Sequence, residues 1–96
     1  MSVQQLADAL RVEVNLIVGE HDSFGGEETR RVYLLLREQG IEHHRARHQA
    51  LGFAIGTLRS RQVAAAANDH CDEALRWMVH AHAIEAAFLR EIGEAA

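Results

Sequence analysis

Seven histidines in 96 residues are the first feature of this chain that suggests chemistry. His44 and His48 lie four residues apart, so a helix would place both imidazoles on one face, where they could ligate a metal ion. Four-helix di-iron proteins build such sites from Glu-x-x-His motifs, and this sequence contains none. If residues 41–67 and 70–92 form a helical hairpin, His82 lies roughly 9 Å along the axis from His48. We therefore expect packing roles for the histidines and no metal or cofactor, with His44 and His48 as the alternative metal site.

A second histidine-based chemistry is phosphoryl transfer. The segment His48-Gln49-Ala50-Leu51-Gly52 resembles the His-x-x-Lys-Gly core of histidine phosphotransfer domains, which are helical bundles of similar size. The resemblance covers five residues and implies that His48 would carry the phosphoryl group. The family's lysine, which helps to hold that group, is Leu51 here, and the helical pattern described below places His48 on a buried face. Phosphotransfer at His48 is therefore the alternative to a packing role.

The other reactive residue types form no catalytic pattern. Cys71 is the only cysteine, and its neighbour His70 would point about 100° away on a helix, so the two make no nucleophile–base pair. We expect a buried structural thiol, and a lone cysteine suits the reducing cytosol. Gly25–Gly26 lacks the spacing of a phosphate-binding loop and predicts a turn. We expect no enzymatic activity and a cytoplasmic location, because Met1–Leu10 has no signal-peptide pattern and no apolar run reaches the ~18 residues of a membrane span.

All ten basic residues are arginines, and they are unevenly distributed. Residues 1–29 carry a net charge of −5, residues 30–61 carry +5, and residues 62–96 carry −4. The favoured interpretation is that a basic central segment pairs with acidic neighbours inside the fold. The alternative is an anion-binding face, although no helix-turn-helix signature accompanies the arginines and nucleic acid is not the favoured partner. Arginine without lysine, beside 16 alanines, is typical of a GC-rich bacterial or phage genome.

A row of residues in the basic segment is the best candidate for a binding surface. One face of a helix there would carry Arg45, Gln49, Gly52, Gly56, Arg59 and Val63. The two glycines leave a trough, which predicts close packing of one of the first two helices or, alternatively, a docking groove for an acidic helix or an anion. The candidate surface for a partner or anion comprises Arg45, Arg47, Gly52, Gly56, Arg59 and Arg61.

These candidates depend on helices, which the composition favours. Ala, Leu, Glu, Arg, Gln and Met make up 53 of the 96 residues, and no proline interrupts a helix. Ser2 and Gln5 predict a capping box, although the alternation over Val12–Val18 would also suit a strand. We predict a single all-α domain over 1–96, a small antiparallel bundle of three to four helices. The expected helices are 3–19, 27–39, 41–67 and 70–92, the last two forming a long hairpin.

The connections between these helices are predicted from turn and cap signals. Glu20–Gly26 is expected to be a loop because it combines Asp, Ser and glycine residues. Gly40 predicts a break or a kink, and Glu42 beyond it is a poor N-cap. Asp69 is expected to cap the last helix.

The last two helices carry more apolar surface than a small bundle covers. A heptad seam comprises Ile41, His44, His48, Leu51, Ile55, Leu58, Gln62 and Ala65. The final helix has two apolar stripes, one of Cys71, Leu75, Met78, His82, Leu89 and Ile92, the other of Trp77, Ala81, Ile84 and Phe88. Its outer face would then carry Arg76, His80, Ala83, Ala87 and Arg90. Because so wide an apolar arc needs more than one neighbour, we expect a homodimer.

The function that these patterns favour is that of a small non-enzymatic interaction or regulatory protein. We expect a bacterial or phage accessory factor that acts as a homodimer by binding a partner protein through helical surfaces, with no membrane role. One alternative is nucleic-acid binding through the arginine-rich segment 30–61. Another is a histidine phosphotransfer-like or metal-binding bundle centred on His48.

Overall fold

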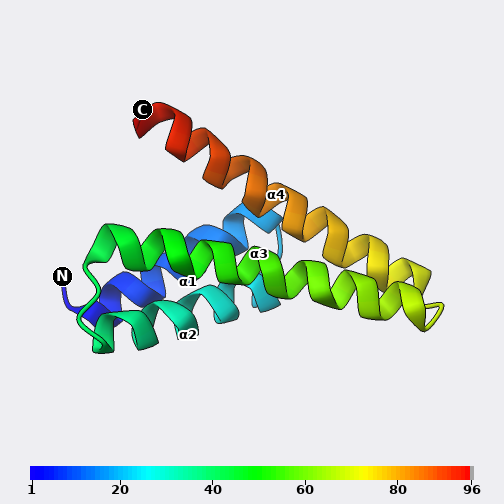
Figure 1. Cartoon of the computed structure of the whole chain (residues 1–96), viewed down its shortest axis with the longest axis horizontal. Helices are drawn as coiled ribbons and strands as arrows, with labels where there is room; N and C mark the ends of the chain where they lie inside the picture. Colours follow the sequence, from blue (N-terminus) through cyan, green and yellow to red (C-terminus); the bar gives the residue numbers. More distant parts are fainter. Residues whose placement is uncertain (96) are drawn as a thin grey trace.

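The helices predicted from composition are all present. The computed structural model describes residues 1–95, and this part of the chain folds into four α-helices without strands. Their bounds are α1 Val3–Val18, α2 Phe24–Glu38, α3 His43–Ala67 and α4 Cys71–Ala95. Consecutive helices run antiparallel, and α3 and α4 form the long C-terminal hairpin (Figure 1). The all-α bundle is confirmed, and the strand alternative for Val12–Val18 is excluded.

The ends of α1 follow from local hydrogen bonding. The Ser2 hydroxyl accepts a hydrogen bond from the Gln5 amide at 3.1 Å, and the Gln5 side-chain oxygen accepts one from the Ser2 amide at 2.9 Å. This reciprocal pair is the predicted capping box. At the other end Gly19 adopts φ +76°, and its amide donates to the Asn15 carbonyl, so the helix stops there.

The start of α2 differs from the sequence prediction, which placed Phe24–Gly26 in a loop. The Ser23 hydroxyl accepts a hydrogen bond from the Gly26 amide at 3.0 Å, so the helix begins at Phe24. In this first turn α2 approaches α1 so closely that a Cβ on Gly26 would overlap the Asn15 side-chain oxygen. That oxygen accepts hydrogen bonds from the Ser23 amide and hydroxyl, at 3.2 and 2.7 Å. The glycine pair therefore serves helix contact, and its prediction as a turn was wrong.

The chain breaks at Gly40 instead of continuing as one helix. α2 ends at Glu38, and Gly40 takes φ +86°, a conformation that glycine adopts readily. The Gly40 amide donates to the Arg37 carbonyl at 3.0 Å, and the Ile41 amide donates to the Leu36 carbonyl at 3.1 Å. These two bonds form a Schellman motif, which reverses the chain toward α3.

The caps of α3 and α4 differ from the sequence prediction. Glu42, expected to be a poor cap, accepts hydrogen bonds from the amides of Arg45 at 2.8 Å and His44 at 3.3 Å. These bonds lower the pKa of Glu42 below the ordinary glutamate value, and the bond from Arg45 has the larger effect. Asp69, expected to cap α4, adopts φ +59° and belongs to the turn, and α4 begins two residues later at Cys71.

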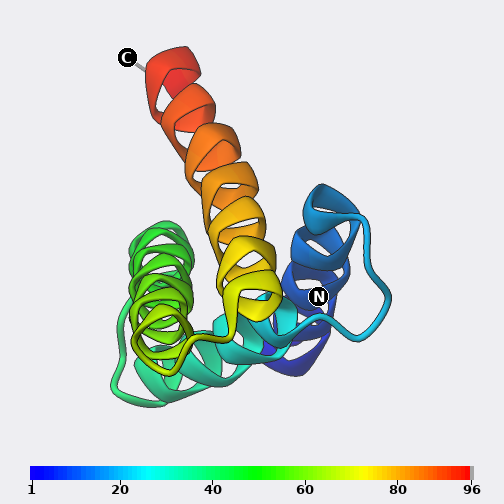
Figure 2. The same cartoon turned by 90° about the vertical axis from the view of Figure 1, so that its right-hand side faces the viewer.

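The core receives side chains from all four helices. Figure 2 shows α4 between α3 and α1, with α2 beneath. The buried apolar side chains are Ala7, Leu10, Val14, Val32, Tyr33, Ala46, Ala50, Leu51, Ala54, Leu58, Ala65, Trp77, Ala81 and Ile84. Six of these fourteen residues are alanines. The helices therefore approach closely, but the apolar area that the core removes from water is small.

The heptad seam predicted on α3 is only partly its buried face. Leu51 and Leu58 are buried, but His44 is exposed and His48 is half-buried. α3 also buries a second row of small side chains, Ala46, Ala50 and Ala54, because it packs against both α2 and α4. Because α3 is buried on two faces, no single heptad seam describes its buried residues.

α4 turns one of its two predicted stripes inward. The inward stripe contains Trp77, Ala81, Ile84 and the half-buried Phe88. The other stripe, with Leu75 and Leu89, is exposed. The predicted outer face was wrong, since His80 is 5% exposed and its Nε2 lies 3.3 Å from the Glu20 carboxylate. Within residues 1–95 no helix, α4 included, has the length and apolar character of a membrane span.

A pair of glycine substitutions tests the helix contact at Gly26. Gly26→Ala should lower the free energy of unfolding by about 2 kcal/mol, because the added Cβ displaces the hydrogen-bonded Asn15 side chain. Gly56→Ala should raise it by about 0.5–1 kcal/mol, because nothing lies within 4 Å of that Cβ and alanine favours the helix. Urea denaturation measures both, and equal effects at the two positions would contradict this account.

Candidate functional site

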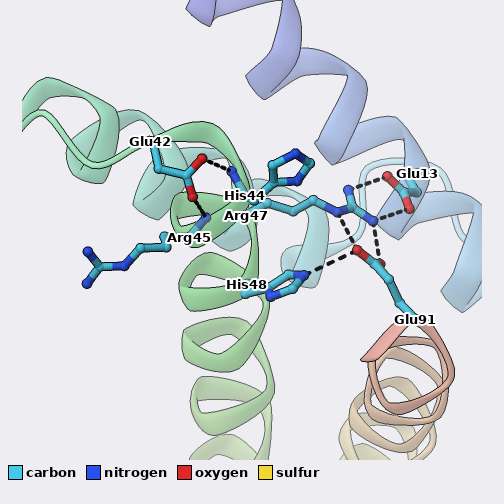
Figure 3. Close-up of polar contacts among 7 residues, drawn as sticks. All are labelled: Glu13, Glu42, His44, Arg45, Arg47, His48 and Glu91. Carbon is cyan, nitrogen blue, oxygen red and sulfur yellow. Dashed lines mark hydrogen bonds and ion pairs between the residues drawn. The ribbon is translucent and has the colours of Figure 1, made fainter. Parts of the chain in front are cut away.

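Arg47 is the centre of an ion-pair cluster that joins three helices (Figure 3). Its guanidinium donates two hydrogen bonds to Glu13 of α1, both at 2.8 Å, and two to Glu91 of α4, at 3.0 and 2.7 Å. The Arg47 side chain is only 17% exposed. The hydrogen bonds that Arg47 donates to the two carboxylates raise the pKa of Arg47, and they lower the pKa of Glu91. We call Glu13, Arg47 and Glu91 the Arg47 cluster. Arg47 was predicted to belong to a surface for a partner or anion, but its guanidinium is already paired inside the fold.

The two histidines predicted as an alternative metal site face different neighbours. His48 lies beside the Arg47 cluster, where its Nε2 is 3.4 Å from a Glu91 oxygen and its ring meets the Phe88 ring edge-on. The His44 ring lies beside the His43 ring, with centroids 5.1 Å apart. Among the side chains that the structure describes, in residues 1–93, no three His, Cys, Asp or Glu groups gather as a metal ion would require.

The surroundings of His48 do not suit a phosphoryl group. The side chain is 39% exposed, more open than the seam predicted, but the Glu91 carboxylate faces its Nε2 and would repel a phosphoryl oxygen. Leu51, at the position of the family's lysine, is buried. The nearby cation Arg47 is committed to two carboxylates. The geometry favours packing against Phe88 and a polar contact with Glu91 as the role of His48.

An apolar cleft of about 640 Å³ opens between α1 and the C-terminal half of α4. Its volume is within the range of ligand pockets. The cleft is lined by apolar side chains that include Val12, Leu16 and Phe88, and by the whole Arg47 cluster. Because the charges of this cluster bind one another, they are not available to orient a ligand.

The glycine row forms an open groove on the outer face of α3. Nothing lies within 4 Å of a Cβ built on Gly52 or Gly56, so neither α1 nor α2 packs into the trough as the favoured interpretation predicted. The groove measures about 570 Å³ and is lined by Gln49, Gly52, Phe53, Gly56, Thr57 and Ser60, which we call the α3 groove. Phe53 is 58% exposed and was not predicted as a surface residue. Its position beside Gly52, off the heptad seam, is the signal that identifies it.

The arginines beside the α3 groove are engaged to different degrees. A guanidinium nitrogen of Arg59 lies 3.7 Å from the Glu85 carboxylate, and both side chains are about two-fifths exposed. Arg61 stacks on Phe24, with its guanidinium carbon 3.7 Å from the ring centre. The Arg45 side chain is exposed and extends away from the Arg47 cluster (Figure 3). Of the predicted surface, Arg45 and Arg59 therefore remain accessible beside the groove.

The basic segment 30–61 is largely neutralised inside the fold, in keeping with the favoured interpretation of the charge blocks. Four of its seven arginines form ion pairs with carboxylates. The pairs are Arg30–Asp8 (2.8 Å), Arg31–Glu28 (2.7 Å), Arg47 with Glu13 and Glu91, and Arg59–Glu85 (3.7 Å). All four of these arginines therefore pair with carboxylates of the two acidic segments that flank them in sequence.

Cys71 is exposed at the first residue of α4, so the expectation of a buried thiol was wrong. The neighbouring imidazole of His70 lies 3.6 Å from the Glu73 carboxylate. The histidine thus faces an acid, and the Cys71–His70 pair has no nucleophile–base geometry.

Known proteins add no constraint to these surfaces. Comparison of the chain with protein-family models, curated proteins and solved structures finds no match. Function therefore has to be inferred from the geometry of the chain, in which the Arg47 cluster is a structural tie and the α3 groove is an open surface.

The Arg47 cluster makes a prediction for stability and its pH dependence. Arg47→Met should lower the free energy of unfolding by about 2 kcal/mol at neutral pH, because Glu13 and Glu91 lose a shared, largely buried partner. Because the pKa of Glu91 is lowered in the folded state, this carboxylate stabilises the fold fully at pH values above the ordinary glutamate pKa of 4.5. That stabilisation is lost as the pH falls through the folded-state pKa. The difference between wild type and variant should therefore shrink in acid.

The matched control is Arg31→Met, which removes a 61% exposed arginine that pairs within one helix and should cost less than about 1 kcal/mol. Urea denaturation from pH 7 down to acid measures all three proteins. A pH-independent gap between wild type and Arg47→Met would show that the ion pairs do not stabilise the fold.

Proposed function

We propose that this chain is a small non-enzymatic interaction protein that binds an acidic helix of a partner protein in the α3 groove and acts as a homodimer. The observation that carries the proposal is the open trough at Gly52 and Gly56, where a foreign backbone can approach α3 closely. An exposed aromatic ring in such a groove is typical of residues that anchor protein partners. Phe53 supplies that ring.

The charges around the α3 groove support an acidic occupant. The residues that line it include no carboxylate, and Arg45 and Arg59 flank it fourteen residues apart on the same helix. The ion pair of Arg59 with Glu85 is long and solvent-exposed, so a carboxylate of the partner can replace Glu85 at little cost. A helix with acidic side chains about four turns apart would meet both arginines.

Nucleic-acid binding is the weaker alternative, because most of segment 30–61 is committed internally. Phosphate binding draws its affinity from free cations, but Arg30, Arg31 and Arg47 form ion pairs of 2.8 Å or less, and Arg61 stacks on Phe24. The composition, rich in alanine and arginine without lysine, supports a bacterial or phage accessory factor. The lone thiol of Cys71 supports a reducing compartment such as the cytoplasm.

Groove substitutions test the proposal. Arg45→Glu with Arg59→Glu reverses the charge at both ends, and Gly56→Leu fills the trough between them. Each variant should reduce capture of the partner from lysate of the source cell at least tenfold, as quantified by mass spectrometry, while circular dichroism stays helical. The reason is that Arg45 is exposed, Arg59 is two-fifths exposed in a long ion pair, and Gly56 faces open space.

The control is Arg31→Glu, which reverses a charge on α2 outside the α3 groove and should leave capture unchanged. The decisive result is a protein lost by both groove variants and kept by the control. If both groove variants retain every protein that wild type captures, the α3 groove is not the binding surface.

A further inference from the structure

The outward face of α4 is apolar along most of its length. Residues at steps of four and three follow one another along it, and we call them the α4 outer stripe: Leu75, Val79, His82, Ala86, Leu89 and Gly93. All six are exposed, Leu75 by 55% and Leu89 by 59%. The stripe lies opposite the buried Trp77 and Ile84. The C-terminal end of α4 projects away from the other helices (Figure 1, Figure 2).

The spacing of this stripe is that of a coiled-coil seam, which requires a second helix to cover it. Steps of four, three, four, three and four residues are the heptad pattern of apolar positions. With Met78 and Ile92 at its edges, the stripe exposes on the order of 400 Å² of apolar surface, the size at which a patch on a monomer marks an interaction site. The buried contacts of α4 lie on its other side, and in the described chain only the end of α1 reaches the stripe, where Val18 lines an open cleft with Leu75 and Val79.

We propose that the α4 outer stripe binds the same stripe of a second copy of this chain, with the two helices antiparallel. This inference rests on the homodimer in the proposed function and names its surface. The two leucines of the stripe are placed symmetrically about His82, since Leu75 lies seven residues before it and Leu89 seven after it. Turning one helix end for end about His82 places Leu75 of one copy against Leu89 of the other, as a two-fold axis requires.

Charges at the ends of the stripe select the antiparallel orientation. Asp72 and Arg90 are 18 residues apart, which is five full turns, so both lie on the same flank of the stripe. In an antiparallel pair the same flanks of the two helices face each other. Asp72 of each copy then meets Arg90 of the other, giving two ion pairs. In a parallel pair these two residues would stand about 27 Å apart along the axis.

The size of this surface predicts a dimer that depends on concentration. α4 has 25 residues and is about 37 Å long, and a pair of such helices buries about 1,200 Å², the lower end of stable interfaces. Sedimentation equilibrium from micromolar to millimolar protein should show wild type passing from monomer to dimer. Leu75→Glu with Leu89→Glu should stay monomeric, with unchanged circular dichroism because both positions are exposed.

The controls separate this inference from groove binding. Arg45→Glu with Arg59→Glu should dimerise like wild type, and Leu75→Glu with Leu89→Glu should still bind the partner of the α3 groove. Wild type that stays monomeric at all concentrations would overturn the dimer while leaving the groove proposal standing. A dimer that survives the α4 variant, or wild type that binds anionic vesicles without dimerising, would also overturn it.

Disulfide trapping tests the orientation. In a Cys71→Ser background, Leu75→Cys and Leu89→Cys proteins should crosslink when mixed and oxidised, because the two positions face each other. Each protein alone should crosslink at least tenfold less. In a dimer of one such protein, the cysteines of the two copies stand about 21 Å apart, beyond disulfide reach. Efficient crosslinking of Leu75→Cys to itself would overturn the antiparallel arrangement.

A charge exchange provides independent support. Asp72→Arg should weaken dimerisation about fivefold by opposing two arginines twice, and adding Arg90→Asp should restore it. Failure of the second change to restore the dimer would contradict the pairing of Asp72 with Arg90.

Discussion

The ion pairs of Arg47 decide which faces of this molecule are covered. α1 and α4 share less contact than consecutive helices do, and Arg47 on α3 reaches both of them through Glu13 and Glu91. Glu91 lies near the C-terminal end of α4, the end that diverges from the other helices (Figure 1). Holding Glu91 fixes the rotation of α4 about its own axis, so that Trp77 and Ile84 point inward and the α4 outer stripe points to solvent. The exposed surfaces thus depend on a charge interaction as much as on apolar packing.

The parts of the fold that the sequence predicts are those determined within a few residues. The Ser2–Gln5 capping box and the break at Gly40 involve groups at most five residues apart, so residue types alone indicate them. The start of α2 is different, because the requirement for glycine at position 26 comes from the side chain of Asn15 on the facing helix. The Arg47 cluster spans 34 and 44 residues, and no local pattern reports such partners.

The same division applies to the candidate surfaces. Helical periodicity places Gly52 and Gly56 on one face correctly, but whether another helix fills their trough depends on the packing of the whole chain. The charge blocks predict internal pairing, yet they do not show that Arg45 stays free while Arg47 is taken. The two stripes of α4 are similarly apolar in sequence, so composition cannot choose between them. Burial of the bulky Trp77 near the α3–α4 turn and the ion pair of Glu91 with Arg47 near the other end of α4 together turn one stripe inward.

The small core and the exposed apolar surfaces are related. A chain of 96 residues with an alanine-rich core buries little apolar area, and larger apolar side chains such as Leu75 and Leu89 remain outside. Covering them with a second copy would couple association to folding stability. Self-association through α4 uses no residue of the α3 groove, so a dimer would present two grooves. A partner with two acidic helices would then bind with an avidity that neither groove reaches alone.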